Sequence, residues 1–167
     1  EKLVGLDARG AGHAAKALVL ADEVLNGGLG ERLRLGRHAQ ALLELDGLVV
    51  AYISDHQQPV GDHHIAPQVL ELCRDADLVI HDAQFEPHEF AVKSDWGHCT
   101  VEYAVQVAAA AGAKRLALFH HDPSHGDEVV DRLLVEARGY AQGTSLVEVI
   151  AAAERTTVSL SLASATA

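Results

Sequence analysis

Three short apolar segments, each ending at an ionisable residue, constrain the fold of this chain more than any other feature. Residues 48–53, 78–80 and 116–119 are nearly continuous runs of aliphatic and aromatic side chains. Such runs are typical of strands that are buried on both faces of a sheet. Because segments with helical spacing lie between them, the sequence predicts an α/β fold.

The remaining elements follow the same alternation. Asp46-Gly47 joins two apolar segments and suits the positive φ angles of a two-residue hairpin turn. Thr100 is a predicted N-cap, and Gly112 is expected to end the helix that Thr100 begins. Further helices are predicted at residues 14–25, 67–74 and 128–138, and further strands at residues 32–35, 41–45 and 156–162.

Length and composition indicate one globular domain, because the chain has 167 residues, of which 49% are hydrophobic. The net charge of −11 disfavours non-specific binding to nucleic acid or to an anionic membrane, since phosphate affinity depends on clustered Lys and Arg. No apolar stretch approaches the roughly 18 residues that cross a bilayer. The two cysteines, Cys73 and Cys99, form no CxxC pair, so they predict no disulfide framework and fit a cytoplasmic protein.

Residues with metal-binding side chains stand where the apolar runs end. Asp55, His81 with Asp82, and His120 follow the three runs, and His98 precedes a predicted helix. Ligands of open α/β sheets bind beyond the carboxyl ends of the strands, so these side chains are expected at one edge. Imidazole and carboxylate suit zinc, and one carboxylate can bridge two ions about 3.5–4 Å apart. Each residue alone is more often a structural hydrogen-bonding group, but together they predict a metal site.

Four segments resemble a known family. They are VAYISDHQQ, ADLVIHDAQF, GHCTVEYAVQVA and LALFHHDP, and their order and separations resemble the C-terminal half of metallo-β-lactamase-fold hydrolases. The ribonuclease Z and cyclic phosphodiesterase branch is the most similar. The resemblance covers residues 42–138 and implies a metallo-β-lactamase-like αββα sandwich, of which only the C-terminal half is present. Residues 1–167 are then a single partial domain, with a poorly matched segment at 1–40 and a low-complexity tail at 159–167.

The resemblance also implies roles for individual residues. Asp55 corresponds to the carboxylate that bridges two divalent metal ions, with zinc the first expectation and manganese or iron the alternatives. His120 corresponds to the last metal-ligating histidine. His98 corresponds to the catalytic histidine that assists phosphodiester cleavage. His81 and Asp82 correspond to a segment that supports the site from behind and orients its ligands.

The chain departs from the family in its N-terminal part. The family's His-x-His-x-Asp-His motif supplies most of the metal ligands, and this sequence does not contain it. His38 is the one candidate for a further ligand, although its surroundings match poorly. Asp55 and His120 alone would hold a metal weakly, because catalytic sites normally use at least three protein ligands. The chain, which opens on Glu1, is therefore expected to be a fragment and to be inactive alone.

Three functions remain open. The first is a metal-dependent hydrolase that cleaves a phosphodiester with a metal-activated water at a dinuclear site in the complete protein. Its acidic composition favours a small phosphodiester or nucleotide-like substrate and disfavours nucleic acid. The second is a receiver-like signalling domain phosphorylated on Asp82, which would leave the histidines unexplained. The third is a non-catalytic remnant of the fold; half a sandwich exposes an apolar face, so homodimers are expected.

Overall fold

A computed structural model describes residues 2–6, 32–35, 40–45, 47–61 and 64–160 of the chain. The helix predicted at residues 14–25 and the candidate ligand His38 lie outside these residues. A six-stranded sheet has the order β2-β3-β4-β5-β6-β7. Its strands are β2 (Arg32–Leu35), β3 (Gln40–Leu45), β4 (Leu48–Ile53), β5 (Leu78–Asp82), β6 (Arg115–Phe119) and β7 (Glu148–Ala151).

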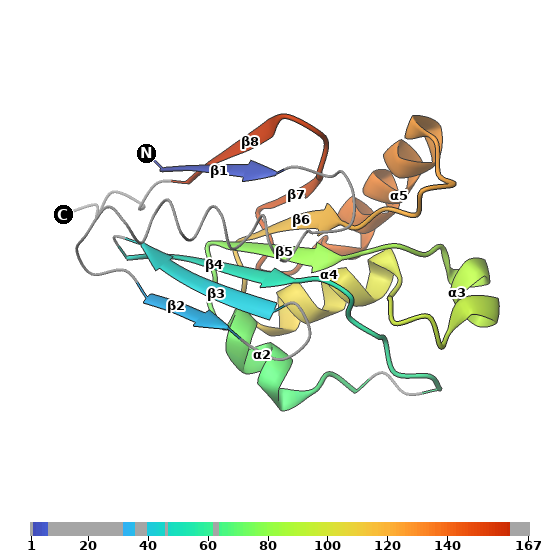
Figure 1. Ribbon diagram of the computed structural model, residues 1–167, viewed down its shortest axis with the longest axis horizontal. Coiled ribbons are helices and arrows are strands. Elements are labelled where there is room, and N and C mark those ends of the chain that lie inside the picture. The colour runs from blue at the N-terminus through green and yellow to red at the C-terminus, as the bar shows by residue number, and fades with distance from the viewer. Residues whose placement is uncertain (1, 7–31, 36–39, 46, 62–63, 161–167) are drawn as a thin grey trace.

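The sheet changes from antiparallel to parallel at β4. β2, β3 and β4 pair antiparallel, whereas β4 to β7 pair parallel. The predicted hairpin is confirmed, because Leu45 pairs with Leu48 and Gly47 has a φ of 79°. The carboxyl ends of β4, β5 and β6 therefore meet at one edge of the sheet, on the right in Figure 1.

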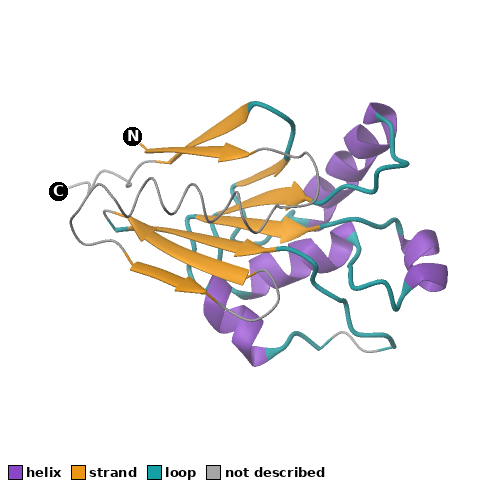
Figure 2. Ribbon diagram, in the orientation of Figure 1, coloured by secondary structure: helices purple, strands orange, loops and turns teal. Residues whose placement is uncertain are grey.

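Two layers cover the two faces of this sheet. On one face lie α2 (Pro67–Cys73), α4 (Val101–Ala110) and α5 (Asp127–Tyr140), and α3 (Pro87–Lys93) lies beyond the carboxyl edge (Figures 1 and 2). On the other face lies a second, two-stranded sheet of β1 (Lys2–Leu6) and β8 (Thr156–Leu160), which pair antiparallel. The α/β prediction is confirmed, with one helical layer and two sheets.

Alternate residues of each central strand supply the two apolar cores. Val79, Leu116 and Leu118 pack toward the helices, whereas Ile80 and Ala117 pack toward β8. Because successive strand side chains point to opposite faces, a strand buried on both faces reads as a continuous apolar run. This explains the three segments that the sequence shows.

Helix α4 begins and ends where its sequence predicts. The hydroxyl of Thr100 accepts a hydrogen bond from the backbone N–H of Tyr103 at 3.2 Å, which caps the helix. Gly112 follows the C-cap with a φ of 75°, a conformation that glycine adopts at no steric cost. The sequence did not predict β1 or β7, which are short strands at sheet edges.

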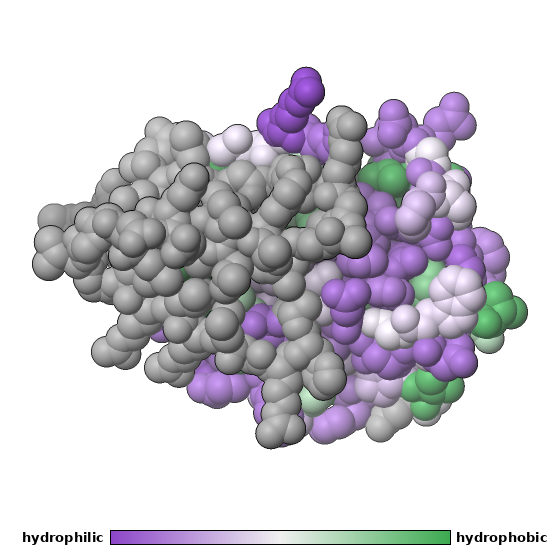
Figure 3. Space-filling model, in the orientation of Figure 1, coloured by the Kyte–Doolittle hydropathy of each residue, from purple (hydrophilic) through white to green (hydrophobic). Residues whose placement is uncertain are grey.

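The described surface carries only scattered apolar side chains. In Figure 3 the coloured part of the visible face is mostly hydrophilic, with isolated hydrophobic residues. None of the described helices is long and apolar enough to cross a membrane. The exposed large apolar residues among the described side chains are Val60, Val92, Trp96, Val135, Tyr140 and Val147.

Replacing Leu116 with Ala should lower the free energy of unfolding by about 2–5 kcal/mol, because it removes a fully buried side chain and leaves a cavity. Urea denaturation monitored by circular dichroism measures the change. The exposed Val135 of α5 is the control, and Val135→Ala should change stability by less than about 0.5 kcal/mol. Equal effects of the two substitutions would contradict the position of Leu116 in the core.

Candidate metal centre

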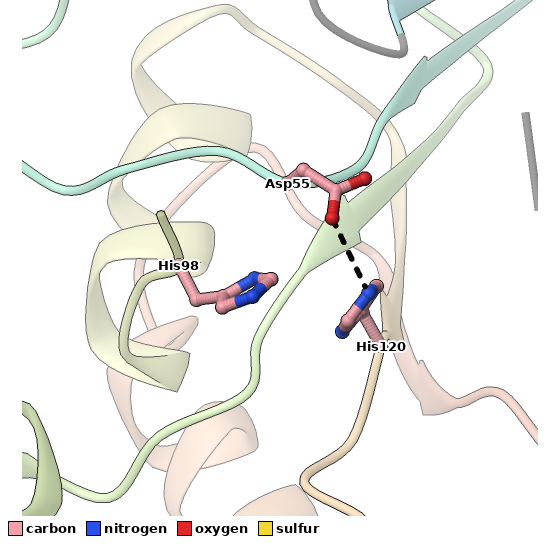
Figure 4. A group of neighbouring side chains, drawn as sticks. All are labelled: Asp55, His98 and His120. Atoms are coloured by element: carbon pink, nitrogen blue, oxygen red, sulfur yellow. Dashed lines mark ion pairs between the residues drawn. The ribbon is translucent and has the colours of Figure 1, made fainter. Parts of the chain in front are cut away.

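Three predicted site residues come together at the carboxyl edge of the sheet. Asp55, His98 and His120 each offer a ligand atom, and these atoms all lie within 4.8 Å of one another. Asp55 Oδ1 lies 3.5 Å from His120 Nε2, and the rings of His98 and His120 have centroids 4.6 Å apart. Figure 4 shows the three side chains pointing toward a common point from three separate segments.

The ends of the parallel strands produce this convergence. Ile53 pairs with His81, and Asp82 pairs with Phe119, so the residues that follow β4 and β6 leave the sheet at the same level. Asp55 and His120 both have left-handed backbones, with φ angles of 50° and 58°. Non-glycine residues in this region are uncommon and often cluster at functional sites. In each case the left-handed residue turns the chain away from its strand beside the site.

Asp82 holds His98 in place through a hydrogen bond. The fully buried carboxylate of Asp82 accepts a hydrogen bond of 2.6 Å from Nδ1 of His98. This hydrogen bond raises the pKa of His98, against the opposing effect of burial. Because Nδ1 carries the hydrogen, the Nε2 atom of the neutral His98 ring keeps its lone pair. The arrangement suits either a ligand atom or, when the ring is protonated, a proton donor.

His81 takes a different place from His98. It is fully buried, its Nδ1 donates to the backbone oxygen of Asp82 at 2.6 Å, and its Nε2 lies 3.0 Å from Nδ1 of His56. His81 must therefore accept at Nε2, and His56 must donate. Burial lowers the pKa of His81, and burial together with the neighbouring His81 lowers the pKa of His56 to about 4. Both rings are held neutral behind the three converging side chains.

The sequence alone did not reveal the position of His56. The structure packs it between His81 and Tyr103, with ring centroids 5.0 and 5.7 Å away. Its position directly after Asp55 could have predicted this, because a residue so close to the end of β4 stays near the sheet.

A second group of ligand-type side chains lies between α3 and the loop after β6. Glu86, Glu89 and His125 also place their ligand atoms within 4.8 Å of one another. Most of their polar atoms already have partners: Glu86 and Glu89 form the capping box of α3, Arg132 donates to Glu86, and His125 Nε2 lies 3.0 Å from Glu89. The buried Nδ1 of His125 has no hydrogen-bond partner among the described residues. This network ties α3 to the loop after β6, a role the sequence did not reveal.

Asp122, in the same loop, completes this network. Burial alone would raise the pKa of Asp122, but hydrogen bonds from Ser124, Lys93 and Gln84 outweigh it and lower the pKa well below its usual range. The ammonium of Lys93 lies 3.1 Å from the Asp122 carboxylate. The loop that begins at His120 is thus anchored to α3 by charge-assisted hydrogen bonds.

Comparison with known proteins identifies the family. Residues 33–121, more than half of the chain, match the family model described as the beta-lactamase superfamily domain. The chain belongs to this superfamily. Ribonuclease Z of Geobacillus kaustophilus is 39% identical over 87 residues, which are 52% of this chain and 28% of that protein. Ribonuclease Z of Listeria innocua is 29% identical over 153 residues, which are 87% of this chain and 48% of that protein.

Solved structures show the same fold. The short form of human tRNase Z superposes with a TM-score of 0.52 at 22% identity, covering 74% of this chain and 38% of that one. The metallo-β-lactamase fold protein YhfI of Bacillus subtilis gives a TM-score of 0.54 at 22% identity, covering 72% of this chain and 43% of that one. The chain therefore spans less than half the length of each of these relatives. The predicted metallo-β-lactamase fold and the resemblance to the ribonuclease Z branch are confirmed.

The predicted partner is wrong. Net charge favoured a small phosphodiester and disfavoured nucleic acid, but the curated relatives are ribonucleases. The physical reason is that a net charge counts residues without their positions. Bound cations and the remainder of such a protein also change the potential that a substrate meets at the site.

The stability of the chain should fall as the pH drops from 7 to 5. His56 has a folded pKa of about 4, below its unfolded value of about 6.5, so its contribution is present above pH 6.5 and is lost as the pH falls toward 4. His56→Asn keeps a side-chain N–H and does not titrate, so it should reduce the loss at pH 5 by about 1–2 kcal/mol. Urea denaturation at both pH values measures this difference.

His88→Asn is the matched control, because His88 is exposed on α3. The opposite contribution of His98, whose raised pKa stabilises the fold at low pH, is present in every variant and cancels in the comparison. A pH dependence that is the same for His56→Asn and the wild type would contradict a buried neutral His56.

Proposed function

We propose that the complete protein is a metal-dependent hydrolase that cleaves a phosphodiester bond of RNA. In this proposal Asp55 and His120 are metal ligands, and His98 is the catalytic histidine. The observation that carries it is the convergence of these three side chains at the carboxyl edge of the sheet. The superfamily match and the ribonuclease relatives support hydrolysis, and RNA as the substrate class, from an independent direction.

The donor set fits a divalent ion such as zinc. A carboxylate and an imidazole are ordinary zinc ligands, and Asp55 Oδ1 and His120 Nε2 are close enough to share one ion with little movement. Asp55 is more than half exposed, so its second oxygen can reach another ion, which supports a dinuclear centre. Because this chain is a part of its relatives' length, we propose that the remaining ligands come from the rest of the protein. A bound divalent ion supplies Lewis acidity and lowers the pKa of a water ligand.

In this proposal His98 donates one proton, and Asp82 holds His98 in the protonated form. Asp82 favours the protonated form of His98, since the negative carboxylate lies 2.6 Å from Nδ1. A protonated His98 can donate from Nε2 to the leaving oxygen of a phosphodiester. His81 is fixed by the backbone oxygen of Asp82, and His56 donates to His81, so these two neutral rings hold the segment beside the site in place.

The receiver alternative has little support in this geometry. A phosphoacceptor carboxylate must be reached by a phosphodonor, whereas the side chain of Asp82 is fully buried. Its oxygens accept from His98 and from the backbone N–H groups of His56, Gln84 and Cys99. Phosphorylation would require all of these hydrogen bonds to break.

Metal binding is the direct test of the proposed ligands. Calorimetric titration of the complete protein with Zn²⁺ should show binding that weakens at least about tenfold in Asp55→Asn and in His120→Ala, because each substitution removes one donor. Asp131→Asn, an exposed carboxylate of α5, is the control and should bind like the wild type. Affinity that is unchanged in both ligand variants would refute the assignment.

The proposed role of His98 is tested in the complete protein. His98→Ala should lower kcat for metal-dependent RNA cleavage by about 10²–10⁴-fold, because proton donation in the transition state typically contributes that much. The variant should retain more of its Zn²⁺ affinity than Asp55→Asn does. A wild-type protein that binds Zn²⁺ and cleaves no phosphodiester would favour the non-catalytic remnant instead.

A further inference from the structure

We infer that Gln57 and Gln58 are positioning residues that hold His98 in register with Asp55. The inference rests on the proposed function, because it assigns these two residues to the same site. Gln57 and Gln58 follow Asp55 by two and three positions, so they belong to the loop that delivers the proposed bridging carboxylate. Their side chains reach across to the segment that carries His98.

Gln58 hydrogen bonds to the residues at and just after His98. Its Oε1 accepts two hydrogen bonds from Thr100, one from the backbone N–H at 3.1 Å and one from the hydroxyl at 2.8 Å. The backbone N–H of Gln58 donates to the carbonyl of His98 at 3.2 Å. Gln58 therefore contacts the His98 segment through three hydrogen bonds, from both its backbone and its side chain.

Gln57 hydrogen bonds to the residue just before His98. Its Oε1 accepts from the backbone N–H of Gly97 at 2.8 Å, and its Nε2 donates to the backbone oxygen of Gln58 at 2.6 Å. The two amides thus satisfy the N–H groups of Gly97 and Thr100, which flank the dipeptide His98-Cys99. The second contact of Gln57 fixes the backbone of Gln58, so the two side chains act as one clamp, which we call the glutamine clamp.

The glutamine clamp also reaches helix α4. The Thr100 hydroxyl has one hydrogen, which it donates to Gln58, and its lone pair then accepts from the N–H of Tyr103. Gln58 thereby orients the hydroxyl that caps α4. The capped helix is packed in the core, so the clamp connects the loop of Asp55 to a rigid element.

The opposite side of the His98 segment is attached to β5 instead. Asp82 accepts from His98 and from the N–H of Cys99, and the N–H of Phe85 donates to the carbonyl of Cys99 at 3.0 Å. These contacts fix His98 relative to the central strand, and Asp82 reaches the loop after β4 through the backbone N–H of His56 at 3.4 Å. The glutamine clamp joins the His98 segment directly to the loop of Asp55 through four hydrogen bonds, and so holds the proposed proton donor at a set distance from the proposed metal ligand.

Amide hydrogen exchange of this chain, measured by NMR, tests the clamp without any assay of activity. In Gln58→Ala the Thr100 amide should exchange at least about tenfold faster, because its acceptor is removed, while the amide of Val107 in α4 keeps its rate. Gln58→Glu retains an acceptor oxygen and should restore the slow exchange. Gln142→Ala, at an exposed turn, is the matched control. Unchanged exchange of Thr100 in Gln58→Ala would overturn the inference.

The functional readout uses the complete protein with its metal. Gln58→Ala should lower kcat for RNA cleavage about ten- to hundredfold, with KM and Zn²⁺ affinity within about threefold, because misplacement of a catalytic group affects the transition state most. Gln58→Glu should recover most of kcat. An equal loss in both variants, or a loss in KM alone, would contradict positioning. Inactivity of the wild type would refute the proposed function, and the exchange rates would still decide the clamp.

Discussion

The buried carboxylate of Asp82 is the interaction on which the site depends. A carboxylate without exposed surface is stable only when its oxygens accept hydrogen bonds, and those of Asp82 come from His98, Cys99, His56 and Gln84. Three segments far apart in the chain therefore meet at the end of one central strand. Each donor satisfies Asp82 and is itself placed by it, so the segments order one another.

Two histidines at the carboxyl end of β5 have pKa values shifted in opposite directions. His98 contacts the charged carboxylate of Asp82, which raises its pKa, whereas His81 contacts only the backbone oxygen of Asp82 and is kept neutral by burial. His56 is also neutral, because burial and the neighbouring His81 lower its pKa to about 4. The hydrogen bond of His98 to a carboxylate and the deeper burial of His81 and His56 thus separate a ring poised to give a proton from two rings that stay neutral.

Much of this could be predicted from the sequence because strand ends are local features. The apolar runs locate β4, β5 and β6, and Asp55, Asp82 and His120 follow from their ends. The short edge strands β1 and β7 were missed, since four or five residues give little periodicity. The contacts of Glu89 with His125 were also missed, because they join residues 36 positions apart. The substrate class was misjudged from a net charge that contains no positions.

Local sequence was enough to predict β4, β5 and β6 and the residue types at their ends, because alternation, turns and caps act between near neighbours. Tertiary structure decided which atoms meet. The hydrogen bond between Gln58 and Thr100 joins residues 42 positions apart, and that between His98 and Asp82 joins residues 16 apart. Such contacts depend on the register of the parallel strands and on the left-handed turns at Asp55 and His120, which only the packed sheet imposes.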